Sequence, residues 1–332
     1  MTAKPLARIY RGTPRNLAYL ARRLRDGELV GVPTETVYGL AANALDPRAC
    51  RAIFRAKGRP TTDPLIVHIH GLAQLEQIAE TNPEALALAR RFWPGPLTLV
   101  LPKRSIVPDL VSAGLPSVAV RMPAHPLFRR LLKQSGLPLA APSANPFGYV
   151  SPTTADHVRA GLGTKIRHIL DGGPSKIGVE STILDLRNTR RPQVLRPGAV
   201  TRTQLEEALR RPVKQKQKRP TSGALLAPGL MSRHYSPRTP AELHARLPAA
   251  SLAAKRVDEA WIYFRRPDAP PPYAKNIFWL DERGRLESAA HRLFAVLRSV
   301  DQQKFRRIHL ERATGTGLAD AINDRLQRAA SR

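Results

Sequence analysis

Short apolar runs alternate with amphipathic stretches along the first 200 residues, and this alternation limits the folds open to the chain. Residues 16–24 place apolar side chains at the i, i+3, i+4, i+7 spacing of one helix face. Residues 83–92 begin a second helix, with Asn82 positioned as its N-cap and Pro83 in its first turn. Five runs between the helices have the length and β-branched content of buried strands: residues 28–33, 64–69, 97–101, 118–121 and 181–186. The pattern predicts an α/β or α+β domain.

The composition changes after residue 201. Residues 210–220 are basic and polar and are bounded by prolines, so they cannot bury enough apolar surface to form a core. We interpret them as a linker, with a basic arm that touches RNA as the alternative. Strand-like and helix-like stretches resume further on, at residues 259–264, 288–297, 307–310 and 318–329. We therefore expect a first domain over residues 1–205, a linker over 206–240 and a second α/β domain over 241–332.

Charge and cysteine content narrow the class of protein. The chain has 54 Lys and Arg against 26 Asp and Glu, a net charge of +28. Such a charge fits a polyanionic partner, but the excess is spread along the whole chain, whereas a nucleic-acid module more often concentrates it. The lone cysteine, Cys50, excludes a disulfide scaffold and a cysteine-clustered zinc site. The first residues lack the apolar core of a signal peptide, and no apolar run reaches the roughly 18 residues of a membrane helix, so we expect a cytoplasmic protein without membrane association.

Six segments are denser in Gly, Pro, Ser, Thr and basic residues than a fold requires: residues 33–40, 57–60, 93–98, 142–145, 171–182 and 195–198. Most of them flank a predicted strand, where α/β proteins place ligands, so together they predict one polar cleft. The cleft would hold four cations (Lys57, Arg59, Arg121 and Arg196) and four hydroxyls (Thr34, Ser143, Ser151 and Ser181). These groups suit a triphosphate or a carboxylate, although each taken alone could be a solvated charge or a turn residue. The phosphate-binding, dinucleotide, serine-hydrolase and zinc-protease motifs are absent.

These segments together resemble the YrdC family of threonylcarbamoyl-AMP synthases. The resemblance rests on P-T-E-T-V-Y-G-L at 33–40, Lys57-x-Arg59, W-P-G-P at 93–96, S-A-N at 143–145 and G-V-E-S-T at 178–182. Residues 227–237 resemble the linker of the family's long, two-domain form, and residues 317–326 resemble the end of its C-terminal domain. The resemblance covers nearly the whole chain in the same order. It implies an open, twisted mixed-sheet catalytic domain and a smaller, Rossmann-like α/β C-terminal domain.

The resemblance also implies a reaction. L-threonine and bicarbonate form N-carboxy-threonine, which reacts with ATP to give L-threonylcarbamoyladenylate and pyrophosphate. A downstream tRNA threonylcarbamoyl transferase complex uses the product to modify the adenosine next to the anticodon. Mg²⁺ would be bound mainly through ATP, and contact with tRNA or RNA would be weak. Two rival functions stay open from sequence: an RNA-binding module, and a carbamoyl-transfer enzyme, although the single cysteine excludes the zinc-finger part of the latter.

Site residues follow from the same resemblance. Lys57 and Arg59 are expected to face the triphosphate as catalytic residues. The threonine pocket is expected to comprise Thr34, His68, Arg121, Ala141 and Ser181. The nucleotide site is expected to comprise Arg59, Asp63, Ser143, Asn145, Ser151, Arg196, His234 and Tyr235, with no metal ligand from the protein.

Two of these expectations carry a specific question. Asp63 stands where many relatives have Asn or His, and an aspartate would repel a triphosphate unless Mg²⁺ or Lys57 intervened. His234 and Tyr235 lie in the linker, which in the long form folds over the active site. Such a lid would keep water from a carbamate and an acyl-phosphate anhydride, both of which hydrolyse readily. The alternative is that these two residues only pack the linker against the first domain.

Overall fold

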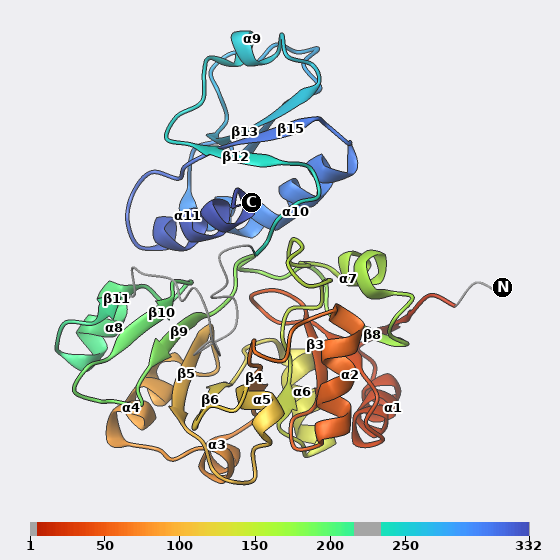
Figure 1. The fold of residues 1–332 in the computed structure, drawn as a ribbon, viewed down its shortest axis with the longest axis vertical. Coiled ribbons are helices and arrows are strands. Elements are labelled where there is room, and N and C mark those ends of the chain that lie inside the picture. Colours follow the sequence, from red (N-terminus) through yellow and green to blue (C-terminus); the bar gives the residue numbers. More distant parts are fainter. Residues whose placement is uncertain (1–4, 216–233, 332) are drawn as a thin grey trace.

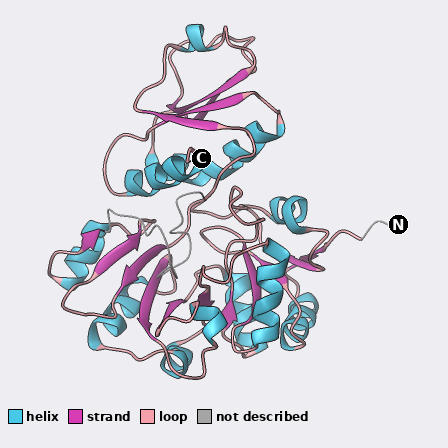
Figure 2. Ribbon diagram, in the orientation of Figure 1, coloured by secondary structure: helices cyan, strands magenta, loops and turns pink. Residues whose placement is uncertain are grey.

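A large mixed sheet forms the centre of the N-terminal unit in the computed structural model, which describes residues 5–215 and 234–331 (Figures 1 and 2). Its described part has 11 strands, and both parallel and antiparallel pairs occur in it. The strand order across the sheet is β1 (Arg8–Arg11), β8 (His168–Asp171), β2 (Val30–Val32), β3 (Gly39–Asn43), β7 (Leu139–Ala140), β4 (Ile66–His68), β6 (Ser117–Arg121), β5 (Leu97–Pro102), β9 (Thr182–Asp185), β10 (Gln193–Arg196) and β11 (Lys214–Gln215). The mixed α/β architecture expected from the sequence is confirmed.

Eight helices of the described residues accompany this sheet: α1 (Pro14–Arg25), α2 (Pro47–Lys57), α3 (Leu72–Ile78), α4 (Pro83–Phe92), α5 (Asp109–Ser112), α6 (Pro126–Ser135), α7 (Ala155–Leu162) and α8 (Arg202–Leu209). The predicted cap of α4 is confirmed, since the Asn82 side chain accepts a hydrogen bond from the Ala85 amide at 2.9 Å. Helix α1 buries the apolar stripe predicted from its spacing, namely Leu17, Leu20, Ala21 and Leu24. Local capping and amphipathicity therefore explain these two helices.

The C-terminal unit has a four-stranded parallel sheet in the order β12 (Ala241–His244), β15 (Arg307–Glu311), β13 (Glu259–Arg265) and β14 (Ile277–Asp281). Its helices are α9 (Ala250–Ala253), α10 (Leu286–Gln302) and α11 (Leu318–Ala329). Ile308 and Leu310 pack in one core with residues of α10 and α11. Successive side chains of a strand point to opposite faces of the sheet, so His309, between Ile308 and Leu310, points to the face away from α10 and α11. This parallel unit fits the Rossmann-like C-terminal domain that the sequence predicted.

Buried polar contacts join the two units, with α10 and α11 lying between the small sheet and the N-terminal unit (Figure 1). Arg298 of α10 donates to the Val150 carbonyl at 2.5 Å, and Tyr149 donates to Asp301 at 2.8 Å. Gly178 of the N-terminal unit lies against α10 of the C-terminal unit. It has φ +84°, and a Cβ there would lie 2.3 Å from the Ala290 carbonyl oxygen, so a side chain would force the interface apart.

The N-terminal unit extends beyond residue 205, where its boundary was expected. That position falls inside α8, and β11 pairs with β10, so the unit continues to Gln215. A Thr201 capping box starts α8, and Leu205 is buried in the main core, which ties the helix to this unit rather than to a linker. Of the predicted linker, residues 216–233 lie outside the described residues.

No helix of the described residues is long and apolar enough to cross a membrane.

Candidate active site

One pocket of the N-terminal unit collects most of the residues that the sequence singled out. It has a cavity volume of about 40 Å³ and lies at the ends of β2, β4, β6, β7, β9 and β10. Ten predicted site residues line it: Thr34, Arg59, His68, Arg121, Ala141, Ser143, Ser181, Arg196, His234 and Tyr235. They come from segments more than 200 positions apart in the chain, so the single polar cleft expected from the loops is present.

Four other predicted residues, Lys57, Asp63, Asn145 and Ser151, are buried but do not line the pocket. The Lys57 ammonium donates to the carbonyls of Ser143 and Asn145 at 2.5 and 2.6 Å. Burial, with the neighbouring Arg59 charge, holds the pKa of Lys57 well below its usual value. In this conformation Lys57 fixes the loop that carries Ser143, and its place is behind the pocket wall.

Arg121 ends β6 with its guanidinium held from three sides. Its Nε donates to the Gly95 carbonyl at 3.1 Å, one terminal nitrogen donates to Thr36 at 2.9 Å, and the other donates to Glu35 at 2.6 Å. A guanidinium has five N–H donors, so two stay available after these bonds among the described residues. The fork is thereby oriented toward the pocket with donors that suit a carboxylate.

Arg59 and Asp63 form a fully buried ion pair of 2.9 Å. Arg59 also donates to the Asp63 and Pro64 carbonyls at 3.0 and 2.7 Å. The Asp63 carboxylate is therefore compensated by a cation and lies outside the pocket lining. In this conformation the charge of Asp63 is paired with Arg59 and is not part of the pocket lining.

Two hydroxyl-bearing loops also line the pocket. Thr34 accepts hydrogen bonds from the amides of Thr36 and Val37 at 3.1 and 3.2 Å, which fixes the turn after β2. Ser181 exchanges a 2.7 Å hydrogen bond with Thr98 and accepts another from Arg196 at 3.1 Å. The hydroxyls are thus held in place before any ligand binds.

Glu180 is a lining residue to which the sequence analysis gave no role. Its carboxylate accepts hydrogen bonds from Ser151 at 2.5 Å and from Arg325 at 2.9 Å. Arg325 belongs to α11 of the C-terminal unit and is completely buried, and its guanidinium lies 5.4 Å from the centre of the Tyr235 ring. Glu180 was visible in the G-V-E-S-T motif, but no local signal pairs it with a residue 145 positions away. Thr36, Arg121's partner, was missed for the same reason.

Two family models match the chain, one on each side of residue 199, so that α8 and β11 fall within the second match. Residues 22–198 match the Sua5, YciO and YrdC family model described as "Telomere recombination". Residues 200–331 match the model described as "Threonylcarbamoyl-AMP synthase, C-terminal domain". The chain belongs to the threonylcarbamoyl-AMP synthase family. Curated members from Pyrococcus abyssi and Bacillus subtilis are each 41% identical to it, over 92% and 95% of this chain and 91% and 92% of theirs.

Solved structures of the same family agree over both units. The structure of P. abyssi Sua5 complexed with L-threonine superposes with a TM-score of 0.87 at 38% identity, covering 98% of each chain. An H234A/Y235A variant of P. abyssi Sua5 superposes with a TM-score of 0.88 at 37% identity, covering 98% of this chain and 96% of that one. The two-domain form of the family is therefore the architecture of this chain.

Two histidines of this family member are held neutral in the pocket. Burial, with the charge of Arg121, lowers the pKa of His68 to about 3. Burial also holds the pKa of His234 well below its usual value, helped by the nearby cations Arg59 and Lys57. A neutral imidazole adds no charge to a pocket that already holds three arginines.

The depressed pKa of His68 predicts acid sensitivity. Between pH 6.5 and about 3 the unfolded chain protonates this histidine and the folded chain does not. Stability therefore falls as pH drops through this window, with a slope of about 1.4 kcal/mol per pH unit from one such group. The free energy of unfolding, measured by urea denaturation at pH 6.0, 5.0 and 4.5, should fall less steeply with decreasing pH in His68→Gln than in wild type. His291→Gln, at an exposed position, serves as the matched control. If the free energy of unfolding of His68→Gln depended on pH as in wild type, the depressed pKa of His68 would be contradicted.

Proposed function

We propose that this pocket forms L-threonylcarbamoyladenylate and pyrophosphate from L-threonine, bicarbonate and ATP. The observation that carries the proposal is the oriented Arg121 fork beside fixed hydroxyls and two further arginines, in a fold that matches an L-threonine complex over 98% of the chain. A carboxylate-binding end and a phosphate-binding end in one pocket are what this reaction requires.

The threonine-binding half of the pocket would lie at the ends of β4 and β6. Arg121 would bind the α-carboxylate through its two remaining donors, and Thr34 and Ser181 would contact the polar groups of the amino acid. The neutral His68 and the backbone at Ala141 would complete this end. The amine of threonine then attacks bicarbonate, and loss of water leaves the carbamate of N-carboxy-threonine.

The nucleotide half is assigned to Arg59, Arg196 and Ser143. The carbamate oxygen forms a bond to the α-phosphorus of ATP as the bond to the β-phosphate oxygen breaks, and pyrophosphate leaves with that electron pair. The two buried guanidiniums would balance the phosphate charge during this step. Lys57, Asn145 and Ser151 would support this half by fixing the loops around it, and direct contact of Lys57 with the triphosphate would need a change from the conformation seen here.

Mg²⁺ would enter this site with the triphosphate. Among the described residues that line the pocket, Glu180 is the carboxylate, and Ser151 and Arg325 already use both of its oxygens. A site without a spare protein carboxylate fits a Mg²⁺ ion held by phosphate oxygens and water. The ion would neutralise phosphate charge there.

His234 and Tyr235 would close the pocket over the reactants. Both are buried and line it, and the Tyr235 ring stacks on Phe294 of the C-terminal unit at 5.4 Å. This position supports the lid interpretation, because the pair reaches the pocket instead of only packing against its outside. Residues 216–233, which include most of the linker motif, lie outside the described residues.

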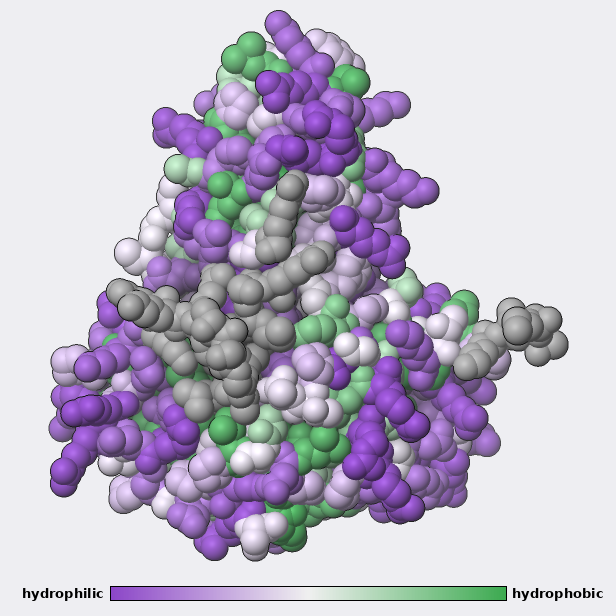
Figure 3. Space-filling view, in the orientation of Figure 1, coloured by the Kyte–Doolittle hydropathy of each residue, from purple (hydrophilic) through white to green (hydrophobic). Residues whose placement is uncertain are grey.

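The product would be passed on in the cytoplasm to a tRNA threonylcarbamoyl transferase complex. A mixed anhydride of this kind hydrolyses in water, so a short path to the transferase is an advantage. Contact with RNA would be weak, because the excess of Lys and Arg is spread along the whole chain. Hydrophilic residues are likewise spread over both units on the face shown in Figure 3.

The test is pyrophosphate release from ATP and Mg²⁺, measured with and without L-threonine and bicarbonate. We expect release that depends on both, with the adenylate identified by mass spectrometry. Omission of either substrate from an otherwise complete reaction is the control. Release that ignores threonine, or no release with salt-sensitive RNA binding instead, would overturn the proposal in favour of an RNA-binding module.

A further inference from the structure

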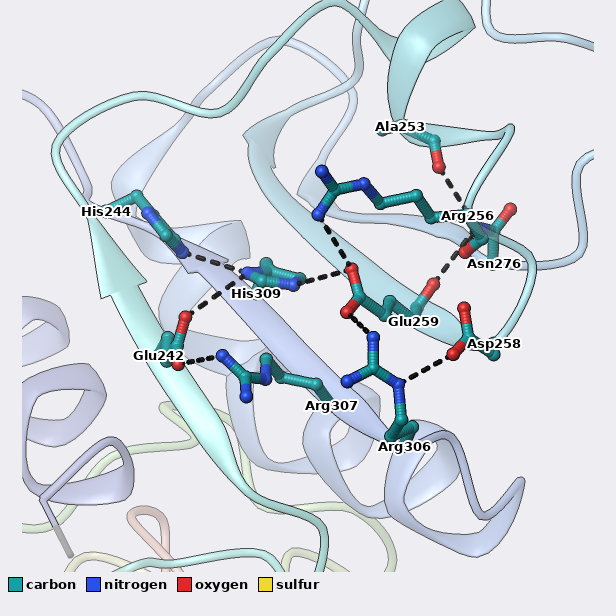
Figure 4. A network of polar contacts seen from close by, with 10 residues as sticks. All are labelled: Glu242, His244, Ala253, Arg256, Asp258, Glu259, Asn276, Arg306, Arg307 and His309. Carbon is teal, nitrogen blue, oxygen red and sulfur yellow. Dashed lines mark hydrogen bonds and ion pairs between the residues drawn. The ribbon is translucent and has the colours of Figure 1, made fainter.

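Two histidines and a glutamate meet in the C-terminal unit, on the sheet face opposite α10 and α11 (Figure 4). Glu242 and His244 are two positions apart on β12 and point to the same face. His309 on β15 lies directly across from Glu242 in the strand register. The cluster is therefore built into two neighbouring strands and does not depend on a loop. It is separate from the active-site pocket, which α10 and α11 divide from this face (Figure 1).

The donor atoms of this cluster are close enough to share one ion. One ligand atom from each residue lies within 4.8 Å of the others. His244 Nε2 and His309 Nδ1 are 3.0 Å apart, and His309 Nδ1 is 3.9 Å from a Glu242 oxygen. Ligand atoms in a tetrahedral zinc site with bonds of about 2.0–2.1 Å lie roughly 3.3 Å apart. Small movements of the side chains would therefore bring the three donors to ligand spacing.

Glu259 gives His309 the tautomer that a metal requires. Its carboxylate lies 3.2 Å from His309 Nε2, so this nitrogen donates its proton there and Nδ1 keeps its lone pair. The Trp261 ring stacks on the His309 ring at 3.9 Å with an angle of 14°, which fixes the plane of the imidazole. A carboxylate behind a ligating histidine is a recurrent feature of zinc sites, where it orients the ring and raises its basicity.

The surrounding arginines do not occupy the donor side of the cluster. Arg307 pairs with one oxygen of Glu242, and the other oxygen faces His309. Arg306 and Arg256 bind Glu259, behind the histidine (Figure 4). These pairs balance the acidic groups, so the net field at the cluster is smaller than two carboxylates alone would give. Selectivity would then depend on the imidazoles, which favour zinc over hard cations such as Mg²⁺.

We propose that Glu242, His244 and His309 bind one Zn²⁺ ion, with water in the fourth position. Binding replaces the hydrogen bond between the two imidazoles, and His244 takes the tautomer with its proton on Nδ1. The ion would cross-link the edge strand β12 to its neighbour β15. Strand β12 starts at Ala241, a few residues after His234 and Tyr235, which line the active-site pocket. The metal cross-link would therefore also hold the chain that follows these two residues.

The full chain, freed of metal by a chelator, is titrated with ZnCl₂ by calorimetry and with Co²⁺ by visible absorption. We expect one Zn²⁺ per chain and the ligand-field bands of tetrahedral Co²⁺. His244→Ala and His309→Ala should each weaken zinc binding by about 100-fold or more, and Glu259→Gln by about 10- to 100-fold. Zinc should raise the Tm of wild type and leave that of His244→Ala unchanged.

The exposed His291→Ala, in the same unit, is the matched control and should bind zinc as wild type does. Circular dichroism, together with pyrophosphate release measured with Mg²⁺ but without zinc, verifies that each variant is folded. Glu242→Gln is a second, milder variant on a half-buried edge position, in case His309→Ala does not fold. Absence of one-to-one binding in wild type, or equal affinity in wild type and His244→Ala, would overturn the proposal.

Discussion

Replacement of Arg121 by alanine is expected to raise the KM for L-threonine by about 100-fold or more and to leave the KM for ATP within about threefold of wild type. Truncating one partner of a buried, hydrogen-bonded charge pair costs about 2–5 kcal/mol, and each 1.4 kcal/mol is a factor of ten. The guanidinium is oriented by three protein acceptors before threonine binds. Steady-state kinetics with each substrate varied in turn measures the split.

The alanine variant also leaves Glu35 buried without its cation, which could lower stability independently of binding. Arg121→Lys separates the two effects, because it keeps a positive charge beside Glu35 but loses the two-pronged donor geometry. It should retain most of the thermal stability and still show the threonine-specific rise in KM. Arg130→Ala, at an exposed position of α6, is the matched control. Equal increases in the KM for threonine and ATP would contradict the carboxylate assignment.

Local sequence signals predicted those parts of the fold that local interactions determine. Asn82 and Pro83 marked the start of α4, and the apolar spacing of residues 16–24 identified the buried face of α1. Gly-, Pro- and Ser-rich loops at strand ends predicted the pocket, because strand ends of one sheet converge in space. Such signals act over one or two helical turns, or depend on a general property of α/β sheets.

Side-chain direction could not be read from the same signals. Lys57 and Arg59 stand two positions apart in one motif, yet Arg59 lines the pocket and Lys57 turns to the carbonyls behind it. The difference is set by the loop at Ser143, which is 86 positions further along the chain. The extent of the N-terminal unit escaped prediction for a similar reason, since β11 is defined by its pairing with β10 and not by its own two residues.

The role of the second domain in the active site also depends on a long-range contact. Arg325 comes from the last helix, is completely buried, and donates to the Pro197 carbonyl at 2.8 Å as well as to Glu180. Glu180 lines the pocket, so the C-terminal unit holds one of the pocket's own walls. Glu180 and Arg325 lie 145 positions apart in the chain, and their charges alone do not indicate that they pair.

Replacement of Arg325 by methionine should therefore reduce both the stability and the activity of the enzyme. Loss of one partner from a buried ion pair costs about 3–5 kcal/mol, because Glu180 is left as an uncompensated buried charge. Movement of Glu180 would also release Ser151 and disturb the nucleotide half of the pocket, so we expect kcat for pyrophosphate release to fall about tenfold or more. Thermal unfolding and steady-state turnover measure the two effects.

A double variant distinguishes the ion pair from simple loss of packing. Glu180→Gln with Arg325→Met removes both charges of this pair, so the double variant should be more stable than Arg325→Met alone while its turnover stays low. The exposed Arg246→Met, in the same unit, should behave as wild type. Wild-type turnover in folded Arg325→Met would contradict the idea that the C-terminal domain positions Glu180. Low turnover with the stability order described would mean that the second domain is part of the active site, because its last helix supplies the cation that fixes a pocket wall.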